Sequence, residues 1–460
     1  MELAMLFAAA VEFVMHEAAL FAAFGFLLLG ASDLLVDFIW IGLTLKRRWS
    51  GGRDTAPAEG IAPARAPGRL AIFTPAWDEA AVIGAMLAHA RTAFGAADYV
   101  HYIGCYANDP ATAATVWAHV GPRVRLVVTP GPGPTSKADC LNNIWARMIE
   151  DEQAQGMRFK AVVLHDAEDV VHSAELPLFD ALIERFDLVQ LPVLPLIDRK
   201  SRWISGHYAD EFTEAHGKEL VVRAGIGASL PSAGVGCAIS RDALAALAAR
   251  YGTPFDPASL TEDYELGLRL KALGRSAAFV RAPAGPGGAT ISTREYFPAT
   301  LDAAVAQKSR WMAGIALAGW DRLGWRGGLA ERWMRTRDRQ AILAALVLGA
   351  AYLALLLWTP LFVLERIGGR AMHAFGPVLT LLIAVNSALL LWRLAMRFGF
   401  VAQAYGWREG LRALPRTVTG NVIAMMAARR ALARYLGQRS TGAAAWDKTA
   451  HIFPDQIPAE

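Results

Sequence analysis

The sequence predicts an α/β domain built on a mostly parallel β-sheet, joined to an α-helical membrane region. Short β-branched or aromatic runs alternate with helical patterns between residues 69 and 338, and the stretches 341–364 and 374–392 carry no charged residue. Apolar residues make up 54% of the chain, and counting Gly in and Tyr out raises this to about 61%, against roughly 45–50% in soluble domains. An excess of this size indicates segments that lie in a bilayer.

Residues 1–48 predict an N-terminal transmembrane helix. Its uninterrupted apolar centre runs from Ala18 to Ser32, and the segment ends in the basic cluster Lys46–Arg48. It lacks the basic start and the small-residue cleavage site of a signal peptide, so we expect an uncleaved helix with its N-terminus outside the cytoplasm. A helix lying in the membrane interface is the alternative.

Residues 49–68 predict a linker, because Gly, Ala, Pro and Arg follow one another there without periodicity. Strand and helix patterns alternate after it. The candidate strands are 70–74, 99–105, 124–128, 161–164, 188–193, 236–240 and 277–280, and the clearest helical patterns are 79–94, 111–119 and 138–149. Such alternation predicts a mostly parallel sheet with helices on both faces, and ligands bind these sheets at the carboxyl ends of the strands.

Residues 339–397 predict a transmembrane hairpin. Each uncharged stretch can cross a hydrocarbon core of about 30 Å at about 1.5 Å per residue, and the turn between them is too short to hold a domain. Arginines flank the hairpin on both sides: Arg332, Arg335, Arg337 and Arg339 before it, Arg393, Arg397, Arg408 and Arg412 after it. The positive-inside bias therefore places both flanks, and the α/β domain with them, in the cytoplasm.

Residues 398–460 predict interfacial helices and a C-terminal tail. Between Arg408 and Arg439, arginines alternate with apolar residues such as Val422 and Leu436. This pattern is typical of a helix that lies along an anionic membrane surface, and it would bring the tail back to the α/β domain.

Charge and cysteine content exclude several classes of protein. The chain has 46 Lys and Arg against 42 Asp and Glu, and the absence of a long like-charge block argues against a nucleic-acid partner. Cys105, Cys140 and Cys237 are widely spaced, which indicates neither a disulfide framework nor a zinc site.

Acidic side chains gather at two places in the α/β domain. The segment His165–Asp169 follows a candidate strand, and its three carboxylates suit a hard divalent cation. Taken alone, it is also typical of a solvated loop with an acidic N-cap. The segment Ser259–Gly267 contains Thr261, Glu262 and Asp263. Thr261 is expected to be an N-cap, and acids in a first helical turn are often there only to complement the helix dipole.

A third motif is helical. Gln307, Arg310 and Trp311 lie at i, i+3 and i+4, on one face of a predicted helix. An amide, a guanidinium and an indole on one face can bind an anionic group and stack on a sugar ring. An amphipathic helix at the membrane surface would also be rich in Trp and Arg.

In this order, the motifs resemble those of family 2 glycosyltransferases of the cellulose synthase kind, and most of all their bacteriophage-adsorption-protein B type, which are inner-membrane glycosyltransferases. The resemblance covers about residues 70–315. The segments that carry it are Thr74–Glu79, Asp166–Asp169, Thr261–Asp263 and Gln307–Trp311. It implies a GT-A (Rossmann-like) catalytic domain over residues 69–338.

The resemblance also implies roles for individual residues. Asp263 would be the general base with Glu262 beside it, and Mg²⁺ or Mn²⁺ would be held by Asp166 with Glu168 or Asp169. The implied nucleotide-binding residues are Pro75, Asp78, Glu79, Asp109, Lys137 and Asp139. The implied acceptor-binding or diphosphate-binding residues are Gly236, Cys237, Gln307, Arg310 and Trp311. Trp446, Lys448 and Thr449 resemble a C-terminal loop that closes the donor site in the cellulose synthase group, and they predict a lid.

The implied activity is inverting transfer of a sugar from a nucleoside-diphosphate donor, with a UDP-sugar favoured, to a growing polysaccharide or envelope acceptor. The enzyme would work in a bacterial inner membrane with its catalytic domain in the cytoplasm, and a polymeric product would call for an envelope export partner. One alternative is a glycolipid synthase with a lipid acceptor. Another is a non-catalytic membrane receptor or scaffold of an envelope export system.

Overall fold

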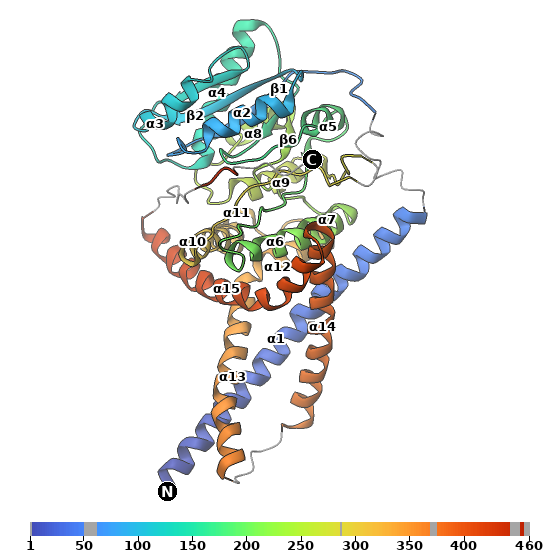
Figure 1. The fold of residues 1–460 in the computed structure, drawn as a ribbon, viewed down its shortest axis with the longest axis vertical. Coiled ribbons are helices and arrows are strands. Elements are labelled where there is room, and N and C mark those ends of the chain that lie inside the picture. Colours follow the sequence, from blue (N-terminus) through green and yellow to red (C-terminus); the bar gives the residue numbers. More distant parts are fainter. Residues whose placement is uncertain (1, 50–61, 286–287, 369–374, 442–450, 455–460) are drawn as a thin grey trace.

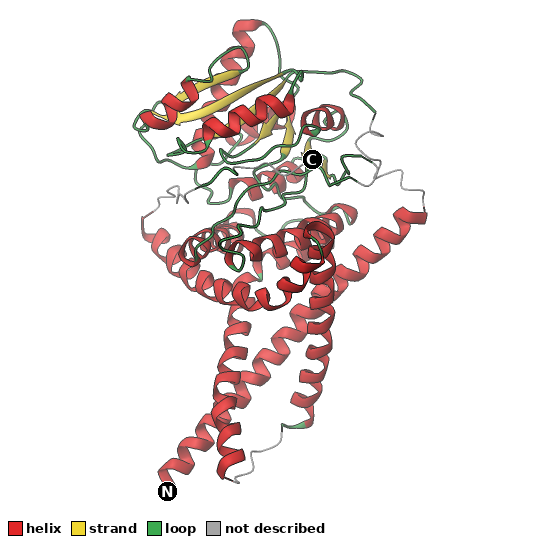
Figure 2. Cartoon of the chain, viewed as in Figure 1, coloured by secondary structure: helices red, strands yellow, loops and turns green. Residues whose placement is uncertain are grey.

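The computed structural model describes residues 2–49, 62–285, 288–368, 375–441 and 451–454 (Figure 1). The chain forms an α/β domain at one end and three long apolar helices at the other, with a layer of further helices between them (Figures 1 and 2). Residues 451–454 lie back against the α/β domain, where Phe453 packs on its core. The expected return of the tail to this domain is therefore confirmed.

Seven strands form one sheet in the order β3-β2-β1-β4-β6-β5-β7. Their bounds are β1 Leu70–Pro75, β2 Tyr99–Tyr106, β3 Val124–Thr129, β4 Ala161–Leu164, β5 Leu188–Gln190, β6 Cys237–Ser240 and β7 Ala277–Phe279. β6 runs antiparallel to β4 and β5, and the other neighbours are parallel. All seven lie where the sequence predicts strands, so the mostly parallel sheet is confirmed.

Helices cover both faces of the sheet. They are α2 Ile83–Phe94, α3 Pro110–Trp117, α4 Lys137–Gln155, α5 Glu175–Leu182, α8 Arg241–Tyr251 and α9 Glu262–Ala272. Successive β1 side chains point to opposite faces: Ile72 packs in the core cluster that contains α2 and α5, and Phe73 in the cluster that contains α4 and α8. The mostly apolar strands are thus buried on both sides, as a parallel sheet requires.

One helix begins later than the sequence predicts. The expected start was Glu79, but α2 begins at Ile83, because the backbone N–H groups of Val82 and Ile83 both donate to the Glu79 carbonyl, at 3.0 Å. Glu79 therefore lies in the turn between β1 and α2 and not on a regular helix. This turn places its side chain at the carboxyl edge of the sheet.

The helix layer below the sheet comprises α6 Ile204–Glu214, η2 Ala215–Glu219, α7 Leu220–Gly225, α10 Leu301–Trp311, η3 Met312–Ala318, α11 Gly319–Leu323, α12 Leu329–Arg339 and α15 Trp407–Thr441. α15 is the predicted amphipathic helix and packs on α6 and α10 (Figure 1). The fully buried Arg416 joins α15 to α6 through Asp210, at 2.6 Å, and it also pairs with Glu409 at 2.9 Å. Breaking a buried pair of this kind costs about 3–5 kcal/mol, so α15 is firmly attached to the domain.

Three helices are long and apolar enough to cross a membrane: α1 Glu2–Trp49, α13 Ala341–Gly368 and α14 Pro377–Tyr405. Both α13 and α14 pack against α1. The acids that interrupt α1 have partners in the helix layer, because Lys218 Nζ lies 2.6 Å from Asp37 Oδ1 and Arg337 Nη2 lies 3.0 Å from Asp33 Oδ1. These ion pairs explain why an apolar helix carries aspartates near its C-terminal end.

Candidate active site

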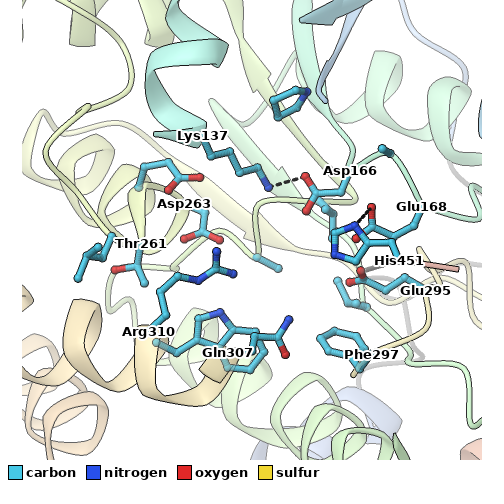
Figure 3. Close-up of a pocket in the computed structure, with 18 of the residues that line it drawn as sticks. Lys137, Asp166, Glu168, Thr261, Asp263, Glu295, Phe297, Gln307, Arg310 and His451 are labelled. Carbon is cyan, nitrogen blue, oxygen red and sulfur yellow. Dashed lines mark ion pairs between the residues drawn. The ribbon is translucent and has the colours of Figure 1, made fainter. Parts of the chain in front are cut away.

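A cavity of about 130 Å³ lies at the carboxyl ends of β1 and β4, between the sheet and the helix layer (Figure 3). Strand ends form one wall, and the first turn of α9 together with α10 forms another. Its polar and aromatic lining includes Pro75, Glu79, Ser136, Lys137, Asp166, Glu168, Phe212, Thr261, Glu262, Asp263, Glu295, Phe297, Gln307, Arg310, Trp311 and His451. The main sequence motifs therefore meet in one place.

Lys137 and Asp166 form the central ion pair of the strand-end wall. Lys137 Nζ lies 2.5 Å from Asp166 Oδ1, and the lysine is the first residue of α4. Although burial opposes its charge, the carboxylates of Asp166, Glu262 and Asp263 raise the pKa of Lys137 above its ordinary value. Lys137 is therefore a fixed positive charge at the centre of the cavity.

Glu79, Glu168 and His451 come together beside this pair. His451 Nδ1 lies 2.8 Å from Glu79 Oε1 and 3.2 Å from Glu168 Oε2 (Figure 3). Burial raises the pKa of Glu168 to about 8, and Asp166 and Glu79 add to that rise. Burial also opposes the charge of His451, but Glu168 and Glu79 raise its pKa to about 9. One ligand atom from each residue lies within 4.8 Å of the others, a grouping that can hold a metal ion.

Asp169 has a different position from Glu168. Its Oδ2 lies 2.8 Å from His165 Nδ1 and accepts the backbone N–H of Asp166 at 3.1 Å. Asp169 is fully buried and is not part of the cavity lining. It therefore holds the loop that carries Asp166, whereas Glu168 reaches the cavity.

Asp263 and Glu262 occupy the first turn of α9. The backbone N–H of Tyr264 donates to Asp263 Oδ1 at 2.7 Å. Burial raises the pKa of Asp263 above its ordinary value, and Lys137 and Arg310 oppose that rise. Burial and the neighbouring Asp263 raise the pKa of Glu262 to about 7. Gly234 has a φ of +79°, and a Cβ there would lie 2.7 Å from Asp263 Oδ2, so glycine allows this close approach.

Thr261 was expected to cap α9, and that expectation is wrong in part. Thr261 stands at the N-cap position, but its side chain makes no capping hydrogen bond. Its Oγ1 is buried without a hydrogen-bond partner among the described residues. The hydroxyl lines the cavity instead, where a ligand can take up its hydrogen bond.

Gln307, Arg310 and Trp311 of α10 form the membrane-side wall. The Arg310 guanidinium points toward Asp263 (Figure 3). The Trp311 ring packs against Phe212 and Phe297, at 6.1 and 6.3 Å between centroids. Gln307 Oε1 is buried and has no hydrogen-bond partner among the described residues. This wall thus combines a cation, an amide and an aromatic surface.

Comparison with known proteins settles the family. The family model described as "Glycosyltransferase like family 2" matches residues 67–314. The chain belongs to this glycosyltransferase family. Its seven-stranded, mostly parallel sheet is a GT-A domain, as the sequence predicts.

The chain is also similar to two curated proteins. They are bacteriophage adsorption protein B of Escherichia coli K12 and bacteriophage N4 adsorption protein B of E. coli O157:H7. Each is 38% identical over 451 residues, which cover 92% of this chain. The chain spans about 60% of the length of these relatives. Among solved structures, a mannosyltransferase from Pyrobaculum calidifontis in complex with GDP-Man and Mn²⁺ gives a TM-score of 0.48 at 15% identity, over 88% of this chain and 99% of that one.

Several predicted site residues of this glycosyltransferase do not line the cavity. Asp109 Oδ2 accepts the backbone N–H of Asp78 at 2.6 Å and its Oδ1 caps α3, so it orders the loop after β1. Asp78 has a φ of +55° and Asp139 lies in the first turn of α4. Gly236 packs against Thr293, and Cys237 is buried in β6. None of these five is part of the cavity lining. The predicted lid residues Trp446, Lys448 and Thr449 lie outside the described residues.

Sequence motifs did not predict Glu295, Phe297 or the role of His451 in this glycosyltransferase. Glu295 and Phe297 belong to a segment that runs beside the chain after β5, through isolated bridges such as Val193 to Thr293. Burial, followed by Asp169, Glu168 and Asp166, raises the pKa of Glu295 well above its ordinary value. A single acid in an irregular segment has no pattern, and only the fold brings it to the site.

Proposed function

We propose that this membrane-bound glycosyltransferase moves a sugar from a nucleoside-diphosphate donor, with a UDP-sugar favoured, to a growing polysaccharide or envelope acceptor, with inversion at the anomeric carbon. One observation carries the proposal. A single cavity is lined by the carboxylates of Glu79, Asp166 and Glu168, by Asp263 and by Trp311.

The first group fits a divalent cation, Mg²⁺ or Mn²⁺. Glu79, Glu168 and His451 offer ligand atoms within 4.8 Å of one another, and both carboxylates are buried. Carboxylate oxygens are what hard divalent ions prefer, and Asp166 is the adjacent acid. A bound cation would supply charge neutralisation to the departing diphosphate. Because Glu168 lines the cavity and Asp169 does not, we assign Glu168 as the second carboxylate.

The chain's own residues carry out the remaining steps. The acceptor hydroxyl gives its proton to the Asp263 carboxylate as its oxygen attacks the anomeric carbon. The bond to the diphosphate breaks, and the diphosphate leaves with the electron pair. Lys137 and Arg310 stabilise the charge that grows on it. A single displacement converts an α-linked donor into a β-linked product.

Trp311 is assigned to the acceptor, because its ring lies in an aromatic cluster that borders the cavity. Sugar rings stack on indoles, and the unpartnered Gln307 Oε1 can accept a sugar hydroxyl. The same wall would suit a sugar chain or the head of a glycolipid. A polymeric product would call for a partner in the envelope that exports it.

The test uses the purified full-length chain with a panel of UDP-, GDP- and ADP-sugars, with Mn²⁺ or Mg²⁺. We expect release of nucleoside diphosphate from one donor class and a β-linked product by NMR. Retention of the α configuration would contradict the single displacement. No turnover of any donor with polysaccharide or lipid acceptors would favour the receptor or scaffold alternative.

For topology, we propose that the catalytic domain is cytoplasmic and that α1, α13 and α14 span a bacterial inner membrane. The arginines that flank the hairpin support this orientation. Reporter fusions after Ser50 and after Gln438 should both report the cytoplasm. Opposite locations for the two fusions would contradict the hairpin.

A further inference from the structure

A second cavity, of about 380 Å³, lies on the other side of the segment that carries Glu295. Glu295 and Phe297 line the active-site cavity, whereas Ser292 and Arg294 line the second one. This alternation is that of an extended chain, whose successive side chains point to opposite sides. The second cavity is bordered by the loop after β4, by η2 and by the C-terminal end of α14 at Phe400, and is therefore separate from the catalytic site.

The polar lining of this cavity consists mainly of hydrogen-bond donors. Arg281, Arg294, His172 and His216 line it, and no Asp or Glu belongs to its described lining. His172 Nδ1 accepts the backbone N–H of Ala174 at 3.1 Å, and His216 Nδ1 accepts that of Val193 at 2.8 Å. Each neutral ring therefore carries its proton on Nε2 and acts as a donor there. Burial and the nearby Arg281 lower the pKa of His216 to about 3, which keeps that ring neutral.

Two of these donors are buried without partners. His172 is only 9% exposed, and its Nε2 has no hydrogen-bond partner among the described residues. Arg294 Nε is likewise buried and unpartnered in the described part of the chain. Leaving a buried donor unsatisfied costs about 1–3 kcal/mol, and more for a charged group. A ligand that accepts hydrogen bonds would recover this cost.

The arginines of this cavity differ from other buried arginines nearby. Arg223 pairs with Asp338 at 2.6 Å and Arg416 with Asp210 at 2.6 Å. By contrast, no described carboxylate forms an ion pair with Arg281 or Arg294. The one hydrogen bond given for the Arg281 side chain goes to the Gly217 carbonyl, at 3.3 Å. At Arg223 and Arg416 the fold supplies the counter-charge, whereas at Arg281 and Arg294 a ligand could supply it.

We propose that this cavity binds a phosphate-bearing anion. Guanidinium groups match the geometry of phosphate oxygens, and the imidazole Nε2–H groups add further donors. The cavity also borders the long apolar helix α14. Trp40 of α1 donates to the Gly217 carbonyl at 3.1 Å and packs on Phe400 of α14, at 5.1 Å between centroids, so two membrane-crossing helices meet at its edge (Figure 1). The phosphate can belong to a lipid headgroup or be free in solution.

The test uses the purified full-length chain in neutral detergent. Native mass spectrometry measures retention of phosphatidylglycerol, with diacylglycerol as the lipid that lacks a phosphate. Thermal unfolding in inorganic phosphate, against chloride of the same ionic strength, measures the soluble source. Arg281→Gln and Arg294→Gln should each weaken binding by about tenfold, the usual effect of losing a charge-assisted hydrogen bond. Arg158→Gln is the matched control, since Arg158 is exposed in the α/β domain and lies outside the cavity.

If phosphatidylglycerol is retained by the wild type and by Arg158→Gln but lost by both cavity variants, the proposal is supported with a lipid source. Stabilisation by inorganic phosphate alone, lost in the same variants, supports it with a soluble source. Equal binding by wild type and both variants would overturn it. If the variants do not fold, the wild-type measurements still test the proposal. A wild-type protein that phosphate does not stabilise and that does not prefer phosphatidylglycerol over diacylglycerol would overturn it.

Discussion

The two walls of the active-site cavity differ in the kinds of side chain that line them. On the strand-end wall, ionisable groups are already paired: Lys137 lies 2.5 Å from Asp166, and His451 lies 3.2 Å from Glu168. On the membrane-side wall, Gln307 and Trp311 offer an amide without a described partner and an aromatic face. Under the proposed function, the first wall would bind the diphosphate and a divalent cation, which nucleotide-sugar donors have in common. The second wall would bind the acceptor, which differs between enzymes.

The largest expected effect lies on the strand-end wall. Asp166→Ala should abolish measurable donor turnover, because it removes the partner of Lys137 and an acid from the proposed cation site. Excess chelator should do the same to the wild type, and added Mn²⁺ should restore it. The measurement is release of nucleoside diphosphate, with circular dichroism as a check of the fold. Asp242→Ala is the control, since Asp242 is an exposed acid on α8. Full activity in excess chelator would contradict the assignment of a cation site to the strand-end wall.

A smaller effect is expected from the tail. His451→Ala should raise the Mn²⁺ concentration for half-maximal turnover by about tenfold, which corresponds to one charge-assisted interaction. Saturating metal should restore turnover. The control is His119→Ala, because His119 follows α3 and does not line the cavity.

Truncation after Ser440 separates His451 from the predicted lid residues. It removes His451 together with Trp446, Lys448 and Thr449. A lid excludes water and stabilises the diphosphate, so the truncated protein should turn over more slowly than His451→Ala even at saturating metal. Equal rates for the two proteins would rule out the lid.

The smallest effect is expected on the membrane-side wall. Trp311→Phe should raise the KM for the acceptor about threefold to tenfold, since aromatic stacking is worth about 0.5–1.5 kcal/mol. The KM for the donor and kcat should change little. Trp117→Phe is the matched control, because Trp117 is exposed at the end of α3. A change in the KM for the donor alone would mean that the membrane-side wall does not bind the acceptor.

The strands and long helices could be predicted from the sequence because each has a local pattern. β-Branched or aromatic residues mark all seven strands, and uncharged stretches mark α13 and α14. The carboxyl-edge position of Asp166 followed from the strand before it. Three features had no local signal. Glu295 lies in an irregular segment, His451 reaches the site from the far end of the chain, and Asp169 is turned away by its contact with His165.

The most direct test of the account is Asp263→Asn. Asparagine keeps the size of the side chain but cannot take the acceptor's proton. Turnover should therefore fall by about 10²-fold or more, the usual size of a general-base contribution, while donor affinity by calorimetry stays within about twofold. The matched control is Asp302→Asn, which changes an exposed first-turn acid of α10. Near-normal turnover by Asp263→Asn would contradict the account and leave Asp263 as an acid that only stabilises the start of α9.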